Sequence, residues 1–139
     1  MRPIHEIIIH HTASPSTWTR DDVLRAHLDR GFRDIGYHLL VFADGHTEPG
    51  RPLSQVGAHA EGRNEGSLGI SLVGDFSRGP VPRPQWDAAV AAVADWCAAY
   101  HVHSSRVLGH CETKATLCPG FDPAVFRAAV KAHRRSDAP

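Results

Sequence analysis

Two histidines and a cysteine stand at the ends of predicted segments, and together they could bind a zinc ion. His10 closes one apolar run, His110 follows a second, and Cys118 lies eight residues further on, in a loop. Imidazole nitrogen and thiolate sulfur are donors that suit Zn²⁺. Three protein donors with a fourth position left open are typical of catalytic zinc, whereas structural zinc sites close all four positions.

Spacing alone does not single out these three residues. His10 and His110 are 100 residues apart, and the chain has 11 histidines, most of which are expected to be ordinary surface or core residues. A lone cysteine is most often a buried, inert thiol. The odd number of cysteines favours metal binding or burial over a disulfide framework. Solvated positions are expected for the histidines that belong to no cluster: His5, His27, His46, His101, His103 and His133.

A series of short strands must position the candidate donors. The β-branched run Ile7–Ile9 predicts a strand over Glu6–His11 that is buried on both faces. Asp44-Gly45 is a hairpin turn signal between two further strands. The other strands are expected over Tyr37–Phe42, Thr47–Glu48, Ser67–Val73 and Arg106–Leu108, with a long surface loop over residues 50–67.

Helices are expected between these strands. Thr19 followed by Asp22 resembles a capping signal for a helix that ends before Gly31. The apolar stripe of Gln85–Tyr100 has helical period. A last helix is expected after an Asp122 cap, with three apolar side chains inward: Val125, Phe126 and Val130. Interleaved strands and helices predict one α/β domain over residues 1–139, a central mixed β-sheet flanked by helices on both faces.

Composition excludes some classes of function. Lys+Arg and Asp+Glu both number 15, and this balance argues against nucleic-acid binding and against a basic membrane-binding surface. The run Ile7–Ile9 is too short for a signal peptide, and Ala88–Ala94 is too short to span a bilayer. We therefore expect a protein made in the cytoplasm without a signal peptide and without membrane insertion.

Five ordered segments give the sequence a family resemblance that reaches from about Ile7 to Phe126. The series resembles the zinc-dependent N-acetylmuramoyl-L-alanine amidases, the family shared by short phage endolysins and the peptidoglycan recognition proteins. The segments are Ile7–Ala13, Asp34–His38, Val56–Ala60, Ser67–Gly74, and Gly109-His110 together with Thr116–Gly120.

The resemblance implies a role for each matching residue. His10, His110 and Cys118 correspond to the ligands of one zinc per chain. Tyr37 corresponds to a tyrosine whose hydroxyl points at the zinc-bound water and the substrate, and Thr116 to a residue that stabilises the oxyanion.

Substrate contacts are implied at three further positions. His59 and Asn64 match the segment that lines the substrate groove, and Arg63 stands where a tyrosine is often found. Trp18, in a loop close after His10, is as consistent with a place in the cleft as with packing.

The function implied is hydrolysis of the amide bond between N-acetylmuramic acid and L-alanine in bacterial peptidoglycan, by a monomeric phage or prophage endolysin that reaches the wall in the periplasm after release. Two alternatives remain: a non-catalytic peptidoglycan-binding module, and a cytoplasmic amidase that recycles wall fragments. In the first, the cysteine is typically replaced, often by serine, and in the second the third ligand is generally aspartate. Cys118 therefore favours the lytic enzyme.

Overall fold

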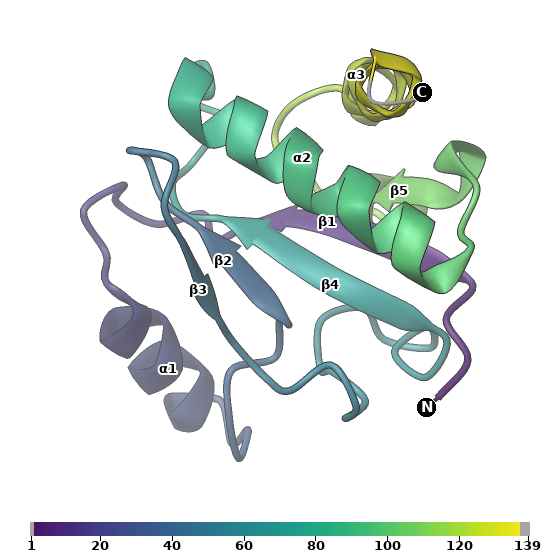
Figure 1. Cartoon of the computed structure of the whole chain (residues 1–139). Helices are drawn as coiled ribbons and strands as arrows, with labels where there is room; N and C mark the ends of the chain where they lie inside the picture. Colours follow the sequence, from purple (N-terminus) through teal and green to yellow (C-terminus); the bar gives the residue numbers. More distant parts are fainter. Residues whose placement is uncertain (1, 137–139) are drawn as a thin grey trace.

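A five-stranded mixed sheet forms the centre of the computed structural model, which describes residues 2–136 (Figure 1). The strand order is β3-β2-β4-β1-β5, and every neighbouring pair is parallel except β2 with β3. The strands are β1 (Glu6–His11), β2 (Leu39–Val41), β3 (Thr47–Pro49), β4 (Ser67–Leu72) and β5 (Val107–Gly109). The carboxyl ends of β1, β2, β4 and β5 therefore meet at one edge of the sheet.

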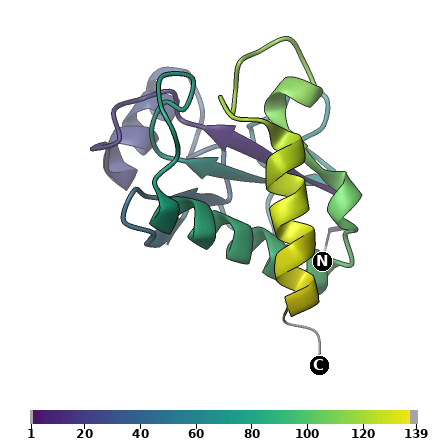
Figure 2. The same ribbon diagram turned by 90° about the horizontal axis from the view of Figure 1, so that it is seen from above.

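Helices cover both faces of this sheet. On one face α2 (Arg83–Tyr100) runs along the sheet, roughly antiparallel to β4, with α3 (Pro123–Ser136) beside it, while α1 (Arg20–Asp29) lies on the other face (Figures 1 and 2). Short 3-10 turns at Ser104–Arg106 and His110–Glu112 flank β5. This arrangement confirms the predicted α/β class with a mixed central sheet. No helix in the described part of the chain is long and apolar enough to cross a membrane.

The sheet separates two apolar clusters. Ile7 and Ile9 of β1 contribute to a large cluster with α2 and α3, and Val23 of α1 contributes to a smaller one on the opposite face. Because side chains alternate along a strand, His10 projects to the same side as Ile8, away from α2 and α3. β1 thus combines a fully buried strand with a polar side chain directed at the α1 side of the sheet.

Local signals located most elements correctly. At the start of α1, the Thr19 hydroxyl accepts a hydrogen bond from the Asp22 backbone N–H at 3.3 Å, and the Asp22 carboxylate accepts one from the Thr19 N–H at 2.8 Å. This reciprocal pair is the predicted capping box. The predicted strand over Tyr37–Phe42 is shorter, covering only Leu39–Val41.

Two expectations about burial were wrong. Val125 is 57% exposed whereas Phe126 and Val130 are fully buried, because four residues return a helix to the same face and position 125 is displaced from that face by about 100°. The segment 50–66 is more than a surface loop. It buries Arg51, whose guanidinium donates to the carbonyl oxygens of Ile35 at 3.0 Å and Val56 at 2.8 Å.

His38 fastens the same segment to the sheet. Its Nδ1 accepts a hydrogen bond from the Gly69 N–H at 3.0 Å, and its Nε2 lies 2.8 Å from the Gln55 carbonyl oxygen. The acceptor role of Nδ1 places the single ring proton on Nε2, from which it is donated to Gln55. Burial, assisted by the nearby charges of Arg2 and Arg51, lowers the pKa of His38 to about 4.

We therefore predict that acid weakens the fold between about pH 6.5 and pH 4. In the unfolded chain His38 takes up a proton near its ordinary pKa of 6.5, while the folded chain resists protonation down to about 4. The stabilisation from neutral His38 is fully present above the unfolded pKa and is lost as the pH decreases toward the folded pKa. The loss from this residue is on the order of 2 to 3 kcal/mol. Urea unfolding of metal-free protein across this range, together with an NMR titration of the His38 ring, measures the effect. A ring pKa near 6.5 would contradict it.

Candidate active site

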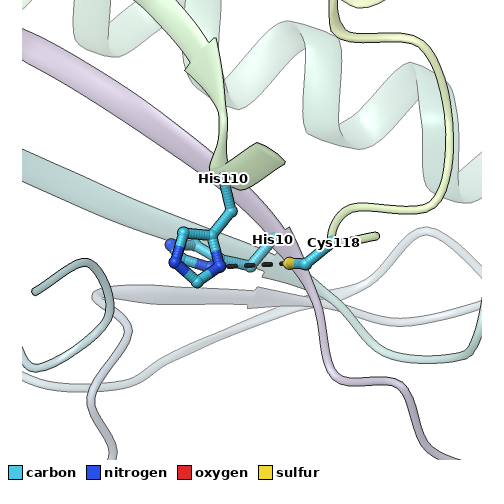
Figure 3. A group of neighbouring side chains, drawn as sticks. All are labelled: His10, His110 and Cys118. Carbon is cyan, nitrogen blue, oxygen red and sulfur yellow. Dashed lines mark hydrogen bonds between the residues drawn. The ribbon is translucent and has the colours of Figure 1, made fainter. Parts of the chain in front are cut away.

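The carboxyl edge of the sheet brings the three candidate donors together (Figure 3). His10 is the next-to-last residue of β1, His110 directly follows β5, and Cys118 comes from the loop beyond. Their ligand atoms all lie within 4.8 Å of one another, and His10 Nδ1 is 3.7 Å from Cys118 Sγ. Tetrahedral coordination with ordinary Zn–N and Zn–S lengths separates donor atoms by about 3.6 Å. The distance between His10 and Cys118 therefore matches zinc coordination, and His110 lies close enough to complete the set of three donors.

Cys118 sits in a pocket suited to a thiolate that is bound to a cation. The backbone N–H of His11 donates to Sγ at 3.3 Å, and the backbone N–H of Cys118 donates to the Thr116 hydroxyl at 3.3 Å. Burial raises the pKa of the Cys118 thiol to about 12. A thiolate at this position needs a positive charge beside it, and a divalent metal would supply that charge.

His10 is held in its neutral form. Burial lowers its pKa well below the ordinary value, and the neighbouring His59 and His110 add to the effect. Neutral imidazole is the form that binds metals. The second nitrogen, Nε2, lies 2.9 Å from Nδ1 of His59, and this contact leaves Nδ1 of His10 facing Cys118.

Tyr37 lies against this group of histidines. The centroid of its ring is 5.1 Å from that of His10 and 5.1 Å from that of His27. Burial raises the pKa of the Tyr37 phenol to about 12, so the hydroxyl remains protonated at neutral pH. Tyr37 can therefore act as a hydrogen-bond donor beside the candidate metal position.

A cleft of about 810 Å³ opens over the cluster. Its wall includes most of the residues expected from the sequence to act on substrate or metal, and it carries both signs of charge. The expected residues are Tyr37, His59, Asn64, Thr116 and the three candidate metal ligands, and the charged ones are Arg30, Lys114, Glu61 and Asp75. A cleft of this size, with apolar, polar and charged groups in its wall, can hold an extended ligand that carries both sugar and peptide groups.

Two residues that the sequence analysis considered for the cleft lie outside its wall. Arg63 is absent from the cleft wall, because its guanidinium pairs with the buried Glu6 carboxylate at 3.1 Å, near the amino end of β1. Trp18 lines a separate hollow with Phe42 and His46.

His27 was expected on the surface but is buried in the cleft wall. Its Nδ1 accepts a hydrogen bond from the Gly36 N–H at 2.8 Å. The sequence did contain a signal for this burial, because His27 lies four residues after Val23 and therefore on the apolar side of α1.

Comparison with known proteins identifies the family. The model of the N-acetylmuramoyl-L-alanine amidase family matches residues 1–121. The chain belongs to this family. The match confirms the resemblance carried by the five sequence segments.

Proteins with similar sequences or structures are named as amidases, as an endolysin and as peptidoglycan-recognition proteins. A peptidoglycan-recognition protein of Drosophila melanogaster is 38% identical over 129 residues, which cover 87% of this chain and 71% of that protein. N-acetylmuramoyl-L-alanine amidase LysC from Clostridium intestinale has a TM-score of 0.87 at 29% identity, covering 94% of this chain and 87% of that one. The Ph2119 endolysin from a Thermus scotoductus bacteriophage has a TM-score of 0.82 at 31% identity, with 94% and 86% covered.

The packing around His59 gives a prediction. A Cβ added at Gly69 would lie 2.6 Å from Cγ of the His59 ring, whereas a Cβ at Gly79 meets nothing within 4 Å. Gly69→Ala should therefore lower the free energy of unfolding by about 1 to 3 kcal/mol, the usual cost of overpacking. Gly79→Ala is the matched control and should leave it within about 0.5 kcal/mol. Equal denaturation midpoints for the two variants would contradict this prediction, because they would show that the His59 ring can move aside without a loss of stability.

Proposed function

We propose that this protein is a zinc-dependent amidase that hydrolyses the bond between N-acetylmuramic acid and the L-alanine of the stem peptide in bacterial peptidoglycan. The observation that carries the proposal is the cluster of His10, His110 and Cys118 in the wall of the cleft, with Tyr37 beside it. A three-donor set leaves one coordination position for the reaction, as catalytic zinc requires. Membership of the amidase family supports the same reaction.

The amide bond needs both activation and charge stabilisation. A zinc ion held by His10, His110 and Cys118 would supply Lewis acidity, which would polarise the scissile carbonyl and lower the pKa of water. The neutral phenol of Tyr37 donates a hydrogen bond to the oxygen that becomes negatively charged. The Thr116 hydroxyl already accepts from the Cys118 N–H, which leaves its own proton to donate to the same oxygen.

The cleft wall supplies contacts for the glycan and peptide. Asn64 Oδ1 accepts hydrogen bonds from the backbone N–H groups of His59 and Ala60, at 3.0 and 2.8 Å, which leaves its amide nitrogen for a ligand. Arg30 and Lys114 are placed to attract carboxylates of a stem peptide. We assign no substrate contact to Arg63, since Glu6 holds its guanidinium outside the cleft wall.

Likeness to the endolysin and to LysC supports a lytic role, in which residues 1–139 act as one monomeric catalytic domain on the wall. The name of the Drosophila relative favours a second candidate, a recognition module that binds peptidoglycan without cutting it. Cys118 and Tyr37 distinguish the two functions, because catalysis needs both and binding alone needs neither.

The Cys118→Ser variant tests the proposal against this alternative. A serine hydroxyl is a far poorer zinc donor than a thiolate, so zinc content and cleavage should both be lost. Sedimentation with insoluble peptidoglycan should remain, because the rest of the cleft wall is unchanged. Metal analysis, turbidity loss of outer-membrane-stripped cells and co-sedimentation are measured on one preparation, with Cys111→Ser as the matched control. Cleavage that persists in Cys118→Ser would exclude this cysteine as a catalytic ligand.

Tyr37→Phe tests the hydroxyl separately from the metal. The ring still packs against His10 and His27, so stability and zinc content should match the wild type. Turnover should fall by roughly 10²- to 10³-fold, the effect of removing one oxyanion donor. Steady-state kinetics on a soluble muropeptide gives the answer, and unchanged kcat would make Tyr37 a packing residue only.

A further inference from the structure

His59 is built into the sheet more tightly than a substrate-contact residue needs to be. Its imidazole is buried between two glycines, and a Cβ would lie 2.6 Å from the ring at Gly69 and 2.8 Å from it at Gly57. Its Nδ1 lies 2.9 Å from Nε2 of His10, and its own Nε2 lies 3.2 Å from the Ser67 hydroxyl. Both ring nitrogens are therefore engaged by protein groups.

The direction of each hydrogen bond follows from the metal site. To bind a metal through Nδ1, which faces Cys118 Sγ at 3.7 Å, a neutral His10 must carry its proton on Nε2. That N–H then donates to Nδ1 of His59. The proton of His59 consequently sits on Nε2 and donates to Ser67 Oγ, whose hydroxyl can donate to the Asn64 carbonyl oxygen at 3.5 Å. Donors and acceptors therefore alternate along this series of hydrogen bonds, from His10 to the Asn64 carbonyl.

We propose that His59 is a positioning residue that fixes the tautomer and ring orientation of His10, so that His10 Nδ1 presents its lone pair to the metal. It acts through His10, a role separate from the groove contact that the family resemblance implies. The inference rests on the proposed function, since zinc is the ion for which His10 is oriented. Partners of this kind on metal-bound histidines commonly change metal affinity by about 10- to 100-fold.

The two glycines explain how the chain accommodates this arrangement. Gly69 belongs to β4, which pairs with β1 so that Ile9 lies opposite Ile70 and His10 opposite Ser71. The bare backbone at Gly69 leaves room for the imidazole of His59 to lie over the strand, within reach of His10 on the neighbouring strand. The backbone N–H of His59 donates a hydrogen bond to the Asn64 side chain, so the backbone of His59 is held in place as well as its ring.

Two substitutions at position 59 separate positioning from substrate contact. His59→Phe keeps an aromatic ring but removes the acceptor, whereas the Oδ1 of His59→Asn can take the place of Nδ1. Zinc affinity, measured by competition with a chromophoric chelator, should fall by about 10- to 100-fold in His59→Phe and be largely restored in His59→Asn. The KM for a soluble muropeptide should stay within about threefold of the wild type in both variants.

The tautomer can also be read without any substitution or substrate. Imidazole ¹⁵N shifts of the metal-free wild type should show the His10 proton on Nε2, and in His59→Phe a mixture of tautomers. A wild-type His10 protonated on Nδ1, or a His59→Phe variant with wild-type zinc affinity and a raised KM, would overturn the proposal. If the wild type binds zinc but cleaves nothing, the proposed function fails, while the affinity comparison still decides the role of His59.

Discussion

The parallel pairing of β1 with β5 is the constraint on which the site depends. Its register sets Ile9 opposite Gly109, so the next residue of each chain segment is a histidine, and the rings of His10 and His110 lie 4.5 Å apart. Gly109 has a second consequence, because a Cβ there would lie 2.3 Å from Pro123. The absent side chain lets the start of α3 and the Cys118 loop close over the end of β5. A register shift of one residue would turn the two histidines to opposite faces.

Burial sets the chemical state of the cluster. It keeps His10 neutral and the Tyr37 phenol protonated, and it makes a thiolate at Cys118 dependent on a neighbouring cation. The same low-polarity surroundings strengthen any hydrogen bond donated to a developing negative charge. Burial alone would disfavour an anion here, so a negative charge in this cleft depends on hydrogen-bond donors such as Tyr37 or on a bound cation.

Periodic sequence signals predicted the regular elements well, and with them the convergence of His10 and His110. The β-branched run before His10, the Asp44-Gly45 turn and the Thr19–Asp22 cap are local features whose structural meaning does not depend on distant residues. The position of Cys118 near the two histidines was inferred from the family resemblance, since loop conformation has no comparable period.

The segment 50–66 was the main failure of sequence reasoning, and the reason is physical. Its path is determined by contacts with distant residues, such as those of Arg51 with Ile35 and of His38 with Gln55, which no local pattern encodes. For that reason the engagement of His59 with His10 and the pairing of Arg63 with Glu6 became visible only in three dimensions.

The products formed from purified peptidoglycan test the central claim most directly. Mass spectrometry of a digest by the zinc-loaded protein should find stem peptides with a free amino group on L-alanine, and glycan strands whose muramic acid carries an unsubstituted lactyl carboxylate. Each cleavage should add the mass of one water molecule, and chelation should abolish it. New reducing sugar ends, cleavage within the stem peptide, or unaltered wall under conditions where the protein holds zinc would contradict the amidase assignment.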